Sequence, residues 1–297
     1  MNATGTKTKV SLRNILYATD FSPSAEAALP YAIELAKRYG AKVHGVHVRF
    51  PAAYPMVGPE GFPYVIEAAE QIAKSEALRL HQMLSSVPHE VSICEGKVWP
   101  LIRDVVTRQN TDMIVIGTSG RTGVKRFFLG SVAEEIFRSA SCPVLTVGPG
   151  VSPDPGRRLE IKEILYATDF SPEALAALPF AVSMAAENQA RLTLLHVMGT
   201  AEMGESVQAE HYADSVRRRL QKLLPTDAKD AFEPMYLVEY GPAADRILEV
   251  ARGLGADLIV LGVRGADAGI GAATHLFRPV AHEVVTQAKC PVLTVRG

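Results

Sequence analysis

The chain has 297 residues, of which 47% are hydrophobic and 21% charged, and its 31 basic residues nearly cancel its 32 acidic ones. This composition excludes a disordered or collagen-like chain, and the charge balance gives no reason to expect nucleic acid or a membrane surface as a partner. No stretch reaches the roughly 18 apolar residues of a membrane span, and the first residues lack the apolar core of a secretory signal. We therefore expect a cytoplasmic protein, and the length predicts two domains of roughly 150 residues.

Several familiar motifs are missing from the sequence. The cysteines, Cys94, Cys142 and Cys290, include no CxxC pair, and isolated cysteines are usually small buried hydrophobic residues. Neither the GxxxxGK[ST] of a P-loop nor the GxGxxG of a dinucleotide fold occurs. We therefore expect no metal held by protein ligands and neither of these two phosphate-binding mechanisms.

An internal repeat organises the whole chain. The nine residues ILYATDFSP at 15–23 return unchanged at 164–172, and CPVLTV recurs from Cys142 and from Cys290. Repetition at so long a period indicates a duplicated domain rather than a solenoid of short units. The segment 148–158, GPGVSPDPGRR, is rich in glycine and proline, as interdomain linkers are.

Each copy alternates strands and helices, here given for the first. Short apolar runs predict strands at Asn14–Thr19, Val43–Val48, His89–Cys94, Met113–Ile116 and Val144–Val147. The first helix should begin at Pro23, with Ser22 as its N-cap, and stop at Gly40. Further helical patterns cover about 65–86, 99–109 and 131–139.

The first helix carries an apolar stripe that we expect to face the sheet. Residues at i, i+3, i+4 and i+7 form it: Leu29, Ala32, Ile33 and Ala36. The second copy has the same stripe at Leu178, Ala181, Val182 and Ala185.

This order predicts an α/β fold of two tandem doubly wound domains. Each should have a five-stranded parallel sheet flanked by helices, in a Rossmann-like arrangement with ligands at the carboxyl ends of the strands. We expect the first domain at residues 1–152 and the second at 153–297.

A set of spaced glycines follows the strand that ends at Ile116. Gly117, Gly120 and Gly130 precede Ser131, in a G-x2-G-x9-G-S arrangement. Glycine at a strand end lets backbone N–H groups approach an anion without obstruction by Cβ. The N-terminus of the helix that Ser131 opens also favours negative charge. The pattern therefore indicates a phosphate-binding loop.

Together with the DFSP turn, the His-Val that ends the second strand and the closing CPVLTV, this element resembles the universal stress protein family, over the whole chain and twice. The resemblance implies an adenine nucleotide alpha hydrolase-like fold and, in the first domain, bound ATP, accompanied by Mg²⁺ through its phosphates. By position it implies that Asp20 contacts the nucleoside, and that Ala18 and Val48 meet the adenine. It assigns ribose and phosphates to Gly117, Gly120, Gly130, Ser131 and the Val132 amide.

Simpler interpretations compete at several positions. Ser131 and Glu134 could form a capping box without any ligand, and Asp20 could merely cap the turn that follows it. Arg121 lies between the glycines and could shield phosphates, although surface arginines are usually just solvated. We interpret His47 as a core histidine whose hydrogen bonds are made within the protein, rather than as a metal ligand or a base.

The second copy keeps Asp169 but has lost part of the glycine element. Alignment back from Cys290 puts Arg278 and Pro279 where Gly130 and Ser131 stand. Proline removes an N–H donor, and arginine adds a side chain where the phosphate would approach. We expect no ATP there; the alternative is that Arg264 or Arg278 holds AMP or another anion.

These observations predict a cytoplasmic stress or signalling factor that responds to ATP in its first domain and has an unidentified protein partner. No general base or Walker lysine stands out, so we expect at most slow ATP hydrolysis or autophosphorylation. The alternative is a nucleotide-independent dimerisation and interaction scaffold. In it, Cys142–Val147 would pair with Cys290–Val295 within one chain, and two chains could form a homodimer.

Overall fold

A computed structural model describes residues 10–49, 62–118, 129–151, 160–199, 206–224, 233–264 and 280–297, and for 62–66 and 206–209 it describes the backbone alone. The strands of the first half are β1 (Asn14–Thr19), β2 (Lys42–Arg49), β3 (His89–Glu95), β4 (Met113–Gly117) and β5 (Val144–Val147). Its helices are α1 (Pro23–Tyr39), α2 (Phe62–Leu84), α3 (Val98–Arg108) and α4 (Ser131–Ser139).

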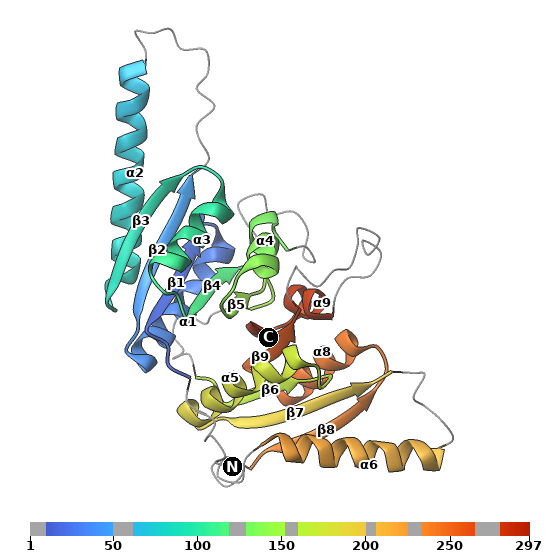
Figure 1. Ribbon diagram of the computed structural model, residues 1–297. Helices are drawn as coiled ribbons and strands as arrows, with labels where there is room; N and C mark the ends of the chain where they lie inside the picture. Colours follow the sequence, from blue (N-terminus) through green and yellow to red (C-terminus); the bar gives the residue numbers. More distant parts are fainter. Residues whose placement is uncertain are drawn as a thin grey trace, which may run out of the picture.

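The second half repeats this order (Figure 1). Its strands are β6 (Glu163–Ala167), β7 (Arg191–Met198), β8 (Met235–Tyr240), β9 (Leu258–Val263) and β10 (Val292–Arg296). Its helices are α5 (Pro172–Asn188), α6 (Ser206–Leu223), α8 (Ala243–Leu254) and α9 (Val280–Gln287). The expected alternation of strands and helices is therefore confirmed in both copies.

The ten strands in the described part of the chain join in one sheet, in the order β3-β2-β1-β4-β5-β10-β9-β6-β7-β8. The strands of each half are parallel, whereas β5 and β10 meet antiparallel, with Leu145 opposite Leu293. The predicted pairing of the two closing strands within one chain is therefore confirmed. The two five-stranded sheets are halves of a single continuous sheet.

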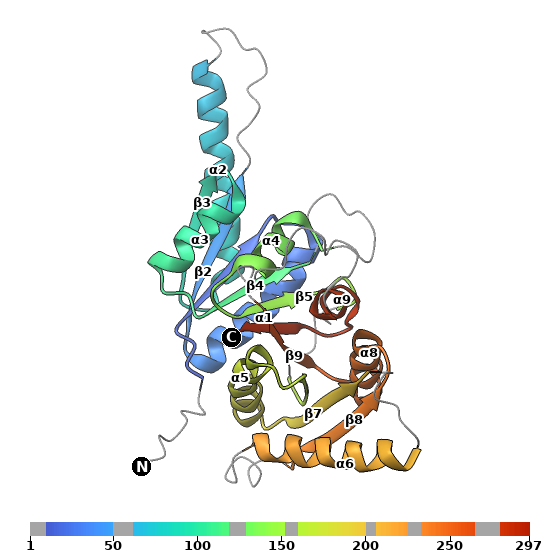
Figure 2. The same cartoon turned by 45° about the vertical axis from the view of Figure 1, so that its right-hand side comes forward.

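Helices cover both faces of this sheet. One buried cluster includes side chains from α1, α2, α5 and α6, and the other includes side chains from α3, α4, α8 and α9. The second view shows α2 running along one end of the structure and α6 along the other (Figure 2). This is the doubly wound arrangement that the sequence predicts.

Local signals set the ends of α1 as expected. The Ser22 hydroxyl accepts a hydrogen bond from the Ala25 amide at 3.2 Å, Pro23 stands at the first helical position, and Gly40 ends the helix with φ of +65°. The same serine cap recurs at Ser171 in the second half. The repeated SP dipeptide therefore has one structural role in both halves.

The buried face of α1 differs from the expected stripe. Leu29 and Ile33 are only half-buried. The residues that α1 buries are Ala25, Ala28, Ala32, Leu35 and Ala36. The alanines let the helix axis come close to the sheet, and Leu29 and Ile33 pack against the core from the edge of the contact. The predicted stripe therefore does face the core, with Leu29 and Ile33 at its half-buried margin, and sequence reasoning missed Ala25, Ala28 and Leu35.

Among the residues that the structure describes, no helix combines the length and the apolar character that crossing a membrane requires.

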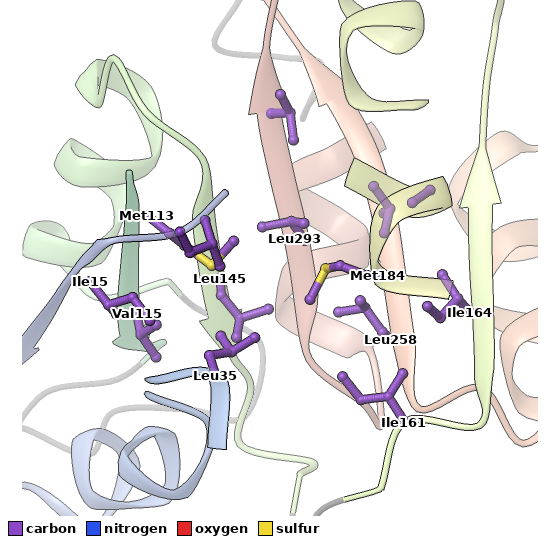
Figure 3. Close-up of a cluster of buried hydrophobic side chains, with 14 of the residues drawn as sticks. Ile15, Leu35, Met113, Val115, Leu145, Ile161, Ile164, Met184, Leu258 and Leu293 are labelled. Carbon is purple, nitrogen blue, oxygen red and sulfur yellow. The ribbon is translucent and has the colours of Figure 1, made fainter. Parts of the chain in front are cut away.

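The core is continuous across the junction of the two halves. Leu145 is 2% exposed and Leu293 is fully buried. Figure 3 shows Ile15, Met113 and Val115 near Leu145, and Met184, Leu258 and Ile164 on the side of Leu293. The hydrophobic effect therefore stabilises the pairing of β5 with β10 in addition to the backbone hydrogen bonds.

Replacing Leu293→Ala should lower the free energy of unfolding by about 2–5 kcal/mol, because a large side chain is removed from a packed core. Equilibrium unfolding in urea measures this change. Leu78→Ala is the matched control, since Leu78 is 59% exposed, and we expect a change within about 0.5 kcal/mol. Equal effects of the two substitutions would contradict a shared core.

Candidate functional site

A cavity of about 180 Å³ opens at the carboxyl ends of β1, β2 and β4, where the N-terminus of α4 closes it. It brings together seven of the nine residues singled out in the sequence. They are Ala18, Asp20, Val48, Gly117, Gly130, Ser131 and Val132. Gly120 and Arg121 lie outside the described residues. The cavity is at the sheet edge where doubly wound folds bind ligands.

The rest of the lining is mostly apolar and was missed by sequence reasoning. These additional residues are Thr19, Ala25, Val46, Val98, Ile102, Ile116, Ala133 and Ile136. Val46 could have been found, because it lies two residues before Val48 and therefore points to the same face of β2. Ile102 could not, since only the folded position of α3 brings it to this cavity. The walls suit a flat apolar group such as a base.

Gly117 has a structural requirement that is independent of any ligand. A Cβ atom at this position would lie 2.3 Å from the carbonyl oxygen of Ser24 at the start of α1. In the second half, a Cβ at Gly262 would lie 2.2 Å from the carbonyl oxygen of Glu173. Glycine is needed at both positions because α1 and α5 approach the sheet so closely. Gly117 alone therefore does not indicate an anion site.

The N-terminus of α4 does not have the capping box that Ser131 and Glu134 could have formed. Gly130, not Ser131, is the N-cap, with φ −60° and ψ 149°, and no side chain caps the helix. The Gly130 amide donates to the Thr118 carbonyl at 2.7 Å, and the Glu134 amide donates to the Gly130 carbonyl at 2.8 Å. Ser131 as the N-cap of a capping box was therefore wrong. A helix start without a capping side chain is suited to an anion.

Asp20 closes a turn between β1 and α1. Its Oδ1 accepts a hydrogen bond from the Ser22 amide at 3.0 Å, and Thr19 Oγ1 accepts one from the Phe21 amide at 2.9 Å. These bonds hold Phe21 at φ 58°, in the left-handed region. The capping role considered for Asp20 is therefore present, and Asp20 is also one of the residues that line the cavity.

The second half repeats this turn but presents different charges beside it. Asp169 Oδ1 accepts from the Ser171 amide at 2.9 Å. Burial opposes ionisation of this carboxyl, but hydrogen bonds from Ser171 and from its own backbone, with the charge of Arg264, lower its pKa overall. Arg264 Nε also lies 3.9 Å from Glu173. Since Arg264 has two carboxylate neighbours, the alternative that it holds an anion is weakened.

The second half differs further from the first at the residues that correspond to the floor of the cavity and to the start of α4. Leu195 stands where the first half has Val46, and its larger side chain is fully buried. Gly265, Arg278 and Pro279 lie outside the described residues. The predicted loss of the phosphate-binding element therefore stays a prediction.

His47 is a satisfied core histidine, as expected. It is 3% exposed, and its Nδ1 donates to the Thr19 carbonyl at 2.7 Å. His196 makes the same bond to Thr168 at 2.8 Å. The Phe21 ring lies 4.7 Å from the His47 ring. The histidine therefore fixes the turn that carries Asp20.

Behind this turn, the first half has charged residues where the second has apolar ones. Glu76 on α2 lies 3.7 Å from His47 Nε2 and 3.5 Å from Arg49 Nε. Arg49 also donates to the Ala69 carbonyl at 2.9 Å. The equivalents of Arg49 and Glu76 are Met198 and Val216, which are buried together with Ala213. The equivalence of α2 and α6 follows from Arg79 and Arg219, which lie over the rings of Phe21 and Phe170.

The arrangement defines a tandem, doubly wound α/β protein with a cavity at the strand ends of its first half. The model of the universal stress protein family matches residues 11–148 and again 160–296. The chain therefore belongs to the universal stress protein family, as a member with two tandem domains.

Relatives support this assignment. A universal stress protein of Methanocaldococcus jannaschii is 31% identical over 138 residues, which cover 46% of this chain and 81% of the relative. One of Thermus aquaticus is 33% identical over 138 residues, covering 46% of this chain and 98% of the relative. The crystal structure of a universal stress protein from Archaeoglobus fulgidus superposes with a TM-score of 0.68 at 20% identity, over 95% of this chain and 98% of that one. This last likeness shows that the tandem fold is shared.

The charged cluster of the first half can be tested by exchanging it for the apolar one. Arg49→Met alone should lower the free energy of unfolding by about 2 kcal/mol, because Glu76, in a largely buried position, then loses its guanidinium partner and keeps only His47 Nε2 at 3.7 Å. Adding Glu76→Val should restore stability, since apolar side chains fill this space in the second half. Urea unfolding of both variants measures this. A double variant less stable than Arg49→Met would show that the two clusters are not equivalent.

Proposed function

We propose that the first domain binds ATP in the cavity and that the chain acts in the cytoplasm as a nucleotide-responsive stress or signalling factor. Membership of the universal stress protein family supports the stress-response role. The main observation in support of nucleotide binding is that residues from β1, β2, β4 and α4 line one cavity. We also propose the domain limits 1–152 and 153–297, although the segment around that boundary is outside the described residues.

The chemistry of the lining fits the parts of an adenine nucleotide. Ala18, Val48 and Ile102 offer apolar walls for the base. The Asp20 carboxylate can accept a hydrogen bond from a ribose hydroxyl. The first turn of α4, which begins at Ser131, offers backbone amides and a positive helix end for phosphate, and Gly130 before it adds no side chain that would obstruct the phosphate.

Magnesium would reach this site with the phosphates rather than through a protein cage. In the described part of the chain, no group of three or more His, Cys, Asp or Glu side chains could hold a metal ion. Among the residues that line the cavity, Asp20 supplies the carboxylate. Mg²⁺ commonly binds through one or two carboxylates and substrate phosphates. When bound, it would neutralise phosphate charge.

The second candidate function is an interaction scaffold, and the antiparallel pairing of β5 with β10 favours it. This pairing joins the two terminal strands within one chain. A homodimer of two chains would therefore have to use another surface. The scaffold differs from the first proposal in needing no nucleotide.

The nucleotide site can be tested by giving the start of α4 the residues that align with it in the second domain, Arg278 and Pro279. Gly130→Arg with Ser131→Pro should weaken ATP binding by about tenfold or more, because it removes one N–H donor and fills the phosphate position. Gly130 has φ −60° and ψ 149°, which a residue before proline adopts readily, and proline suits the first helical position. The fold should therefore survive. Titration calorimetry with ATP measures the change.

Gln82→Arg is the matched control, because it adds the same charge to an exposed position on α2. It should leave the ATP affinity unchanged. Unchanged or tighter ATP binding by the double variant would contradict the proposed phosphate position. If that variant keeps its stress-related activity in cells after losing ATP binding, the scaffold is the better account.

A further inference from the structure

Two histidines face each other on the first domain, away from the cavity. His81 lies in the last turn of α2 and His89 is the first residue of β3. His81 Nδ1 and His89 Nε2 are 3.0 Å apart, and the ring centroids are 5.1 Å apart. His81 is exposed and His89 half-buried. The cavity lies at the carboxyl ends of the strands, whereas this pair lies at the opposite end of β3.

Packed backbone holds both histidines. Leu80 and Leu84, which flank His81 on α2, are fully buried. His89 is paired with Val43 in the sheet. The two imidazoles are therefore presented by rigid elements, and little order would have to be created on binding a ligand.

A backbone carbonyl sets the tautomer of His89. Its Nδ1 lies 2.8 Å from the Val87 carbonyl oxygen and donates to it. The proton is therefore on Nδ1, and Nε2 presents its lone pair toward His81. Metal-binding histidines are commonly oriented in this way, with the second ring nitrogen donating to a backbone carbonyl.

The separation of the two nitrogens matches two ligands of one metal ion. Zinc–imidazole bonds are about 2.0–2.1 Å long. Nitrogens in adjacent positions would then be about 2.9 Å apart in a square-planar site and about 3.4 Å apart in a tetrahedral one. The observed 3.0 Å falls within this range.

We propose that His81 and His89 bind one divalent late transition-metal ion, such as Zn²⁺ or Cu²⁺, with water completing its coordination. Imidazole selects such ions, whereas Mg²⁺ prefers oxygen ligands. The ion would tie the end of α2 to the start of β3. The second domain has Gln221 and Pro234 at the corresponding positions, so the site belongs to the first domain.

Zinc binding to the full-length chain, free of affinity tag and nucleotide, tests this proposal. Equilibrium dialysis with ZnCl₂ should give one ion per chain for the unmodified protein. His81→Gln and His89→Gln should each weaken binding by about tenfold or more. Zinc should also raise the Tm of the unmodified protein but not of either variant, because it binds the folded state.

His211→Gln and Cys94→Ser are the controls, since they remove another exposed histidine and a half-buried thiol. Both should bind zinc as the unmodified protein does, and Mg²⁺ should not compete. Zinc binding that survives in both histidine variants, or no zinc binding by the unmodified protein at millimolar concentration, would overturn the proposal. The two histidines would then form only the hydrogen bond between their rings.

Discussion

The antiparallel pairing of β5 with β10 is the interaction on which the architecture depends. It joins two parallel half-sheets, and Leu145 and Leu293 face each other within a core that both halves share. A strand edge with unpaired backbone groups would otherwise be exposed in each half. Because β5 and β10 satisfy each other's backbone hydrogen bonds, the two halves of the duplicated chain form their interface within one molecule. The two domains can then diverge while their junction stays fixed.

Divergence is visible where the two halves use equivalent positions differently. The turn after the first strand is the same in both, down to the hydrogen bond that a serine amide donates to the side chain of the aspartate two residues before it. Behind it, Arg49 and Glu76 replace the apolar pair Met198 and Val216. Apolar packing of this space is generally at least as stable as a buried ion pair. Stability alone therefore does not explain the charged cluster. Glu76 lies beside His47, and His47 holds the turn next to the cavity, so we infer that the cluster helps to position this turn.

Much of the fold was predictable, because strong local signals coincide with real boundaries. The repeat gave the two copies, and α4 begins and ends where the sequence predicts. The face of α1 was predicted only in part: Ala32 and Ala36 are buried as expected, but a hydrophobicity pattern ignores how closely a helix can approach the sheet, so it missed Ala25 and Ala28. Gly117 was attributed to phosphate, although contact with α1 already requires it. Ile102 and the pairing of His81 with His89 arise from tertiary packing, which no local pattern contains.

We propose that nucleotide binds to the first of the two duplicated domains and not to the second. The most direct measurement is the nucleotide content of the chain purified without added ligand: denaturation, chromatographic quantification of what is released, and then saturation with ATP to count the sites. We expect one ATP site per chain. Two ATP sites would contradict the proposal that the second domain binds no ATP. No binding at millimolar ATP would contradict the nucleotide site of the first domain.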